Sequence, residues 1–164
     1  MAVDRAARIA LPIETGFTKL LDLDRCYSKC WIPVDDGKYL VLYNQHLSAY
    51  TSDGTIAQTQ LELLAADMLA EYEAGNYVVG GGDFNKDLLG NSGEVFGVTG
   101  GDYTWNQPIP EGTIPAGLTL VNSLDEADPI PSNRVADGPY VKGETFVSTL
   151  DGFIVSDNVQ VQIG

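Results

Sequence analysis

Hydrophobic positions in the first 47 residues follow the alternation that is typical of β-strands. Strand-like runs occupy residues 8–13 and 20–32, and a third run, KYLVLYNQHL, occupies residues 38–47. Residues 35–38 form a predicted turn between the second and third runs, in which Gly37 is suited to a positive φ. Both alternating faces of the third run are apolar, which predicts a strand that is covered on both sides.

A helical pattern follows the third run. Gly75 is suited to end this helix, and Ser52 or Asp53 can cap its start. The positions that recur at helical spacing and form one apolar stripe are Ala57, Leu61, Leu64, Ala65, Met68 and Tyr72. The next apolar run, at residues 77–79, is a short predicted strand. The succession of strand, helix and strand predicts a crossover unit.

The second half of the chain has a different composition. Residues 90–143 hold 9 of the 18 glycines and 6 of the 8 prolines, which predicts long ordered loops without a helix. Strand-like runs return at residues 145–147, 150–155 and 159–163. The whole pattern predicts an α/β (α+β) protein with a mainly antiparallel sheet and one long helix at about 55–74.

Length, charge and cysteine content narrow the classes of function. The chain has 164 residues, which fits one domain, and no apolar stretch approaches the ~18–20 residues of a membrane span. Its formal net charge of −14 argues against binding of long nucleic acid through a basic surface of its own. If the chain binds a phosphate, we expect a metal cation to mediate the contact. In an extended strand Cys26 and Cys30 lie ~13 Å apart, too far for a disulfide.

Polar residues follow the glycine-rich end of the strand at 77–79. In the segment Gly81-Gly82-Asp83-Phe84-Asn85 a carboxylate and an amide come directly after the glycines. If the extended geometry continues, Asp83 and Asn85 point the same way and Phe84 points into the core. Such a pair suits a hard cation or a phosphate oxygen, and the alternative is an ordinary turn.

Two further polar residues lie at predicted strand ends. His46, the only histidine, ends the third strand, and it is either a structural histidine or part of a site. Asp151 is the second residue of the run at 150–155, on one face with Val147 and Phe153, where burial of an unpaired carboxylate would be costly. We therefore expect Asp151 to have a partner, either as a structural anchor or as the orienter of a catalytic group.

The order of these motifs resembles the endonuclease/exonuclease/phosphatase family, the deoxyribonuclease-I-like phosphoesterases. The motifs are NQHL at 44–47, the amphipathic helix, YVVGGGDFN at 77–85 and LDGFIVS at 150–156, and the likeness runs from about residue 21 to residue 163. The resemblance implies part of a four-layer α/β/β/α sandwich in which Mg²⁺ (or Mn²⁺) assists phosphoester hydrolysis. It also implies four catalytic residues, namely His46, Asp83, Asn85 and Asp151.

Each of these residues has a role that the resemblance implies. Asp83 and Asn85 would lie at the metal, and Asp83 would activate or orient the attacking water. Asn85 and His46 would hydrogen-bond the phosphate oxygens. Asp151 would orient a catalytic histidine, as a carboxylate does for an imidazole.

The sequence also departs from the family pattern. The family's early Asn, its metal-binding Glu and its final Ser-Asp-His motif have no counterpart among the 164 residues, and Ser156-Asp157-Asn158 follows Asp151 too closely to be that motif. We therefore expect one domain that resembles the C-terminal half of the family fold, truncated at both ends and with little activity alone. The alternative is a non-catalytic half-domain that binds a partner, or a second copy, through an open sheet edge.

Two loop residues are weaker candidates for substrate binding. Trp105 could contact substrate or simply pack, and Arg134 could touch a phosphate or form a loop ion pair. The phosphoester itself could be a small molecule, a lipid headgroup or nucleic acid, since users of all three share these motifs.

Overall fold

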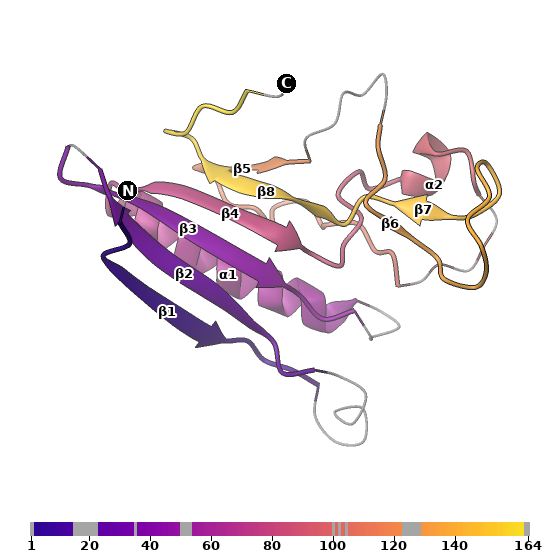
Figure 1. The fold of residues 1–164 in the computed structure, drawn as a ribbon, viewed down its shortest axis with the longest axis horizontal. Helices are drawn as coiled ribbons and strands as arrows, with labels where there is room; N and C mark the ends of the chain where they lie inside the picture. Colours follow the sequence, from indigo (N-terminus) through magenta and orange to yellow (C-terminus); the bar gives the residue numbers. More distant parts are fainter. Residues whose placement is uncertain are drawn as a thin grey trace.

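The computed structural model describes residues 2–14, 23–34, 36–49, 54–99, 101, 103, 105–122 and 129–162. They form a six-stranded sheet in the order β1-β2-β3-β4-β8-β5 and a two-stranded sheet of β6 and β7 (Figure 1). The strands are β1 (Arg5–Ala10), β2 (Cys26–Pro33), β3 (Tyr39–His46), β4 (Tyr77–Asp83), β5 (Leu118–Val121), β6 (Asn133–Arg134), β7 (Val147–Ser148) and β8 (Asp151–Ser156). The helices are α1 (Thr55–Glu73) and α2 (Ser92–Val95).

The predicted crossover unit is confirmed. β3 and β4 are parallel neighbours joined through α1, whereas every other pair in the large sheet is antiparallel. The turn between β2 and β3 has Gly37 at φ 78°, as the sequence predicts. Because β3 and β4 run in the same direction, their carboxyl ends lie at the same edge of the sheet.

Helix α1 covers one face of the sheet with the predicted stripe. Its buried residues include Leu61, Leu64 and Met68, which have no exposed surface, while Tyr72 is only partly buried. Gly54, in the left-handed conformation, is the N-cap, and no side chain caps the helix among the described residues; the predicted caps at 52 and 53 lie outside them. The stripe packs on side chains from β3, β4 and β8, and this contact forms the hydrophobic core.

A buried ionic cluster also joins α1 to the sheet. The Lys29 ammonium lies 2.8 Å from carboxylate oxygens of both Asp67 and Glu71. Tyr27 donates a hydrogen bond to Asp67 and Trp31 donates one to Glu71. Burial opposes the ionisation of Glu71, but the hydrogen bond and charge of Lys29 outweigh it and lower the pKa of this carboxyl. The cluster therefore fixes the helix on the sheet through charge as well as apolar packing.

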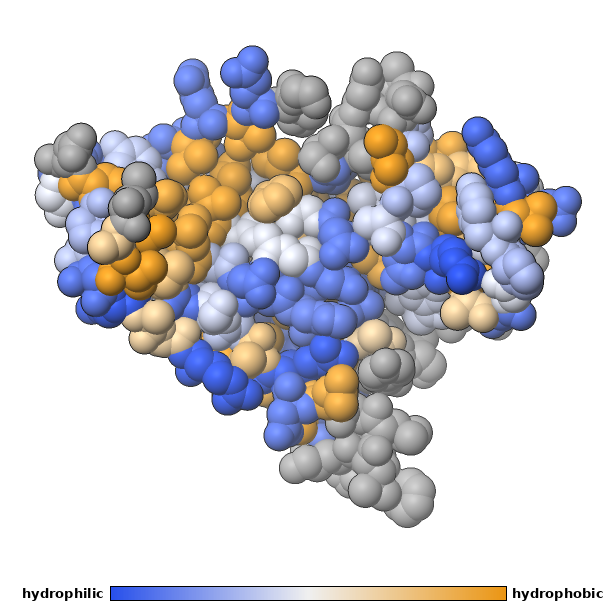
Figure 2. Space-filling view, in the orientation of Figure 1, coloured by the Kyte–Doolittle hydropathy of each residue, from blue (hydrophilic) through white to orange (hydrophobic). Residues whose placement is uncertain are grey.

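The opposite face of the sheet is not covered by the described residues, so the prediction that β3 is covered on both sides is wrong. Val41 and Tyr43 are buried under α1, but Leu40 and Leu42 on the other face are only partly buried. Figure 2 shows hydrophobic side chains gathered on this face, away from the carboxyl ends of β3 and β4. We call this surface the open face; the free thiols of β2 and the half-exposed Phe153 of β8 belong to it by strand register.

Several predicted element bounds are corrected. Residues 159–162 form no strand, and residue 163 of that predicted strand lies outside the described residues. The region 90–143 is mostly loop as predicted, but it contains α2, β5 and β6. The first strand begins at Arg5, three residues before the predicted start. No helix in the described ranges is long and apolar enough to cross a membrane.

Candidate active site

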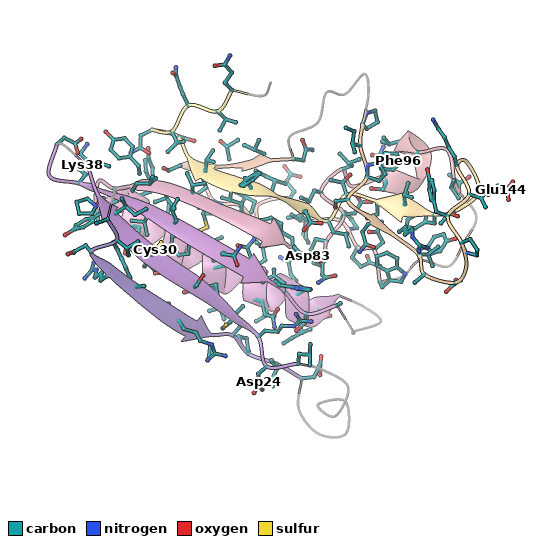
Figure 3. All side chains as sticks on the ribbon, viewed as in Figure 1. Asp24, Cys30, Lys38, Asp83, Phe96 and Glu144 are labelled. Carbon is teal, nitrogen blue, oxygen red and sulfur yellow. The ribbon has the colours of Figure 1, made fainter. Side chains whose placement is uncertain are left out.

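Three adjacent strands bring His46, Asp83 and Asp151 to one place. In the sheet register His46 pairs with Asp83 across β3 and β4, and Asp83 pairs with Asp151 across β4 and β8. Paired residues on neighbouring strands project from the same face of a sheet, so the three side chains share the open face. Figure 3 shows Asp83 at the carboxyl end of β4, away from the hairpin tip that carries Lys38.

The Asp83 carboxylate has a different neighbour at each oxygen. Its Oδ2 lies 3.6 Å from Nε2 of His46, and its Oδ1 accepts a 2.8 Å hydrogen bond from the Asn85 backbone N–H. The second contact is an Asx turn, so the turn interpretation of this segment is confirmed together with the proximity to His46. The His46 side chain is 60% exposed and that of Asp83 only 23% exposed, so the imidazole is the more accessible of the two.

Asn85 follows the strand in a different conformation from the one predicted. Its φ of 47° is left-handed, so the extended geometry does not continue past Asp83 and that expectation is wrong. Its Nδ2 donates a 2.7 Å hydrogen bond to the Leu47 carbonyl, which ties the ends of β3 and β4 together. Oδ1 can then contact a cation, and the second N–H of Nδ2 can still donate to a phosphate oxygen. Phe84 is fully buried, as predicted.

The glycines before Asp83 allow β4 to fit between its neighbours. Gly82 has φ 144°, and a Cβ there would collide with the carbonyl oxygen of Gln45. A Cβ at Gly81 would lie 2.7 Å from the ring of Phe153, which covers this position. Because these glycines have no Cβ, β4 can lie close to β3 and β8, and Asp83 follows directly at the end of this run.

The surroundings of Asp83 make it harder to ionise. Burial raises the pKa of its carboxyl, and the negative charge of Asp151 raises it further. The Asn85 N–H bond and the positive charges of His46 and Arg25 oppose this effect only in part, so the pKa remains above its usual value. A carboxylate with a raised pKa is a stronger proton acceptor than an ordinary aspartate.

Asp151 is exposed, contrary to the expectation of a buried carboxylate that needs a partner. Its position is fixed through the backbone instead, since the N–H groups of Leu150 and Asp151 both donate to Oγ of Ser132, at 2.9 and 3.0 Å. Ser132 was not found from the sequence, because a single serine in a loop gives no signal of what it will contact.

Asp87 was also missed, although it organises the loop that follows the site. It is almost fully buried, and its carboxylate accepts hydrogen bonds from the backbone N–H groups of Leu89, Gly90 and Ser92, from Ser92 Oγ and from Asn106 Nδ2. The only sequence signal is an aspartate three residues before a Gly-Asn-Ser segment, which is common in loops.

The structure does not bring the weaker candidates to the four site residues. Trp105 packs edge-on against Phe146 at 6.1 Å, and within the described residues no hydrogen bond or ring contact joins it to the site. Arg134 makes no ion pair within the described ranges; its Nη1 donates to the carbonyls of Val135 and Gly138. Trp31, the other tryptophan, is buried in the core, and its Nε1 donates a hydrogen bond to Glu71.

The donors present fit a weak magnesium site. The two carboxylates of Asp83 and Asp151 lie on residues that pair across β4 and β8, and Asn85 adds an amide oxygen. Within the described part of the chain no group of three His, Cys, Asp or Glu residues is arranged to hold a metal. Mg²⁺ usually takes one or two carboxylates and completes its shell with water and phosphate, so this set is compatible with it.

Solved structures share this arrangement of strands and helix. TDP2 from D. rerio, in complex with a single-stranded DNA product, superposes with a TM-score of 0.59 at 18% identity, over 94% of this chain and 52% of its own. ANGEL2, a 2′,3′-cyclic phosphatase, gives a TM-score of 0.57 at 15% identity, over 96% and 55%. The human Nocturnin catalytic domain with a bound sulfate anion gives 0.54 at 14% identity, over 95% and 48%.

The chain has the deoxyribonuclease-I-like fold. The three neighbours are members of the endonuclease/exonuclease/phosphatase superfamily, so the resemblance inferred from the motifs is confirmed at the level of the fold. The chain spans about half the length of the structures that it matches. No family model and no curated protein matches its sequence. Within this deoxyribonuclease-I-like fold, His46, Asp83 and Asp151 lie where three adjacent strands end or begin.

Proposed function

We propose that the chain provides part of the active site of a metal-dependent phosphoesterase. The observation that carries the proposal is the placement of His46, Asp83 and Asp151 on one face of a deoxyribonuclease-I-like sheet, at one edge. The raised pKa of Asp83 and the exposed imidazole of His46 supply a proton acceptor and a hydrogen-bond donor side by side.

Each residue has a proposed task. Mg²⁺ or Mn²⁺, held by Asp83 and Asn85, would polarise the phosphoryl oxygen and stabilise the charge of the transition state. Asp83 orients the attacking water and accepts its proton, while His46 and Asn85 hydrogen-bond the phosphate oxygens. Burial raises the pKa of Asp83 most and the charge of Asp151 adds to it. The exposed Asp151 carboxylate is also free to orient an acid–base group supplied from elsewhere.

We propose further that the chain alone has little activity. It carries one histidine, which the proposal assigns to phosphate binding, so no second imidazole serves as a general acid. Such a group typically contributes ~10²–10⁴-fold to the rate. The two proposed protein ligands, the Asp83 carboxylate and the Asn85 amide oxygen, also predict weak metal affinity.

Activity and metal binding can be tested on the same protein. The expected turnover of bis-p-nitrophenyl phosphate and of plasmid DNA, with Mg²⁺ or Mn²⁺, is close to the background of an Asp83→Ala variant. Mn²⁺ should nevertheless broaden the NMR signals of His46 and of the amides at 83 and 151, and should do so less in Asp83→Ala. Absence of local broadening would contradict the metal site, and robust turnover that Asp83→Ala abolishes would contradict the low activity.

A second candidate is a non-catalytic half-domain that binds a second copy of itself. The open face favours it, because apolar side chains such as Leu42 and Phe153 are left partly exposed there. In that case the chain would have the family fold without phosphoesterase activity, and added phosphate would not shift the NMR signals of His46.

A further inference from the structure

A groove leads from Asp151 along β6. One pocket of about 440 Å³ is lined by Gly82, Asp151 and Phe153, and a second of about 370 Å³ is lined by Arg134 and Tyr140. Both are also lined by Pro131 and Ser132, so the two pockets adjoin, and we call the pair the groove. In Figure 1, β6 and β7 lie beyond the carboxyl ends of β3 and β4, on the side where the candidate site opens.

The backbone of β6 sets the spacing along this groove. The N–H of Ser132 donates to the Ser148 carbonyl and the N–H of Val135 donates to the Phe146 carbonyl, both at 3.0 Å, so the strand geometry extends on each side of β6. Side chains two positions apart on a strand lie on the same side, ~7 Å from each other. Arg134 is therefore one such step from Ser132, whose Oγ accepts the Asp151 N–H.

The guanidinium of Arg134 is held in one orientation by its own loop. Nη1 donates to the carbonyls of Val135 and Gly138, at 3.0 and 2.9 Å. Within the described ranges, Nε and Nη2 make no hydrogen bond or ion pair. These two nitrogens form the edge with which arginine binds a phosphate through two parallel hydrogen bonds.

The surface around Arg134 suits an anion that carries an aromatic ring. Residues 130–149 contain two basic and two acidic residues, so this segment is neutral in a chain of net charge −14. Tyr140 is 54% exposed and lines the same pocket as Arg134. An exposed aromatic ring beside a phosphate-binding group is the combination on which nucleobases stack.

We propose that the groove binds the phosphate and the base of the nucleotide next to the reacting phosphoester. Arg134 takes this second phosphate, Tyr140 stacks on its base, and the substrate class is a short single-stranded oligonucleotide. This inference rests on the proposed function, because the first phosphate lies at His46 and Asp83.

The test compares a mononucleotide with a dinucleotide by NMR on the full chain, with Mg²⁺ present. 5′-dTMP should shift the His46 ring and the amides of Asp83 and Asp151. The dinucleotide pdTpdT should also shift the amides of Arg134 and Tyr140 and should bind about tenfold more tightly. Arg134→Gln and Tyr140→Ala should each remove most of this gain, and Lys38→Gln, which loses an equal charge at the distant hairpin tip, should keep it.

The outcomes separate this inference from the proposed function. If both nucleotides shift His46 and Asp151 with equal affinity while Arg134 and Tyr140 do not respond, the groove assignment is overturned and the proposed function stands. If neither nucleotide shifts His46, Asp83 or Asp151, the proposed function fails and the inference fails with it. An inositol bisphosphate could instead bind at Arg134 as tightly as pdTpdT, with no loss of affinity in Tyr140→Ala. The groove would then recognise the phosphate but not the base, and the oligonucleotide assignment would be overturned.

Discussion

The carboxylate of Asp83 is destabilised by the surroundings that the proposed chemistry requires. It lies partly buried beside Asp151, and both effects raise its pKa. Between the ordinary aspartate value near 3.9 and this raised value, the folded chain therefore binds more protons than the unfolded chain. Stability then falls as the pH rises through this window, and the loss persists at neutral pH.

We expect Asp83→Asn to stabilise the fold at pH 7, by about 0.5–1 kcal/mol. Asparagine carries no charge to desolvate and keeps the Oδ1 that accepts the Asn85 N–H. The gain should shrink as the pH is lowered toward the ordinary aspartate value, because the native carboxyl is then protonated. Urea unfolding at a series of pH values measures it, with the exposed loop variant Asp137→Asn as control. A gain that is equal at every pH would contradict this explanation.

The candidate site could be predicted from sequence only in part. The crossover unit places the ends of β3 and β4 together, so the proximity of His46 and Asp83 follows from local pattern. The pairing of Asp83 with Asp151 joins residues far apart in the chain, and only the family resemblance suggested it. The contacts of Ser132 and Asp87 depend on loop conformations for which single polar residues give no signal.

Among the elements, α1 was predicted most accurately. Its stripe repeats over about four turns, so many positions specify the same buried face. The structure ends the helix within one residue of the prediction. Residues 159–162 show the opposite case, since their strand-forming residues pair with none of the described strands, and pairing cannot be predicted from a short local pattern. Gln60 was missed because its burial depends on hydrogen bonds to Ser48 and Pro12, outside the helix.

Substitutions in α1 should affect stability differently on its buried and exposed faces. Leu61→Ala or Leu64→Ala should lower the free energy of unfolding by ~2–5 kcal/mol, because each leucine is fully buried against the sheet. The matched control is Leu63→Ala, since Leu63 is 49% exposed and should change stability by less than about 0.5 kcal/mol. Urea unfolding of the three variants measures this. A similar small loss at all three positions would show that the helix does not pack as described.

For the whole molecule, the open face predicts self-association. Burial of apolar surface stabilises a contact by ~25 cal/mol per Å², and a two-fold dimer is the simplest way for two such faces to cover each other. We therefore expect sedimentation velocity to show a dimer that becomes more populated as the concentration rises through the micromolar range.

Variants of two leucines test which surface is used. Leu42→Gln, on the open face, should weaken the dimer about tenfold or more, since an unpaired amide would be buried in the contact. Leu63→Gln, on the solvent side of α1, should leave it unchanged. A monomer at every concentration, or an equal effect of both variants, would contradict association through the open face.

The position of β8 between β4 and β5 has a consequence for synthesis. Asp83 of β4 pairs with Asp151 of β8, and Val79 pairs with Val155. During synthesis this edge of β4 stays unpaired until residues 68 and 76 positions later in the chain have been made. At about 5–20 residues per second, a nascent chain leaves that edge unpaired for roughly 4–15 s. Three consecutive glycines, Gly80 to Gly82, lie along it and have low strand propensity. The residues that let β4 fit between its neighbours in the finished protein therefore also discourage wrong partners while it is being made.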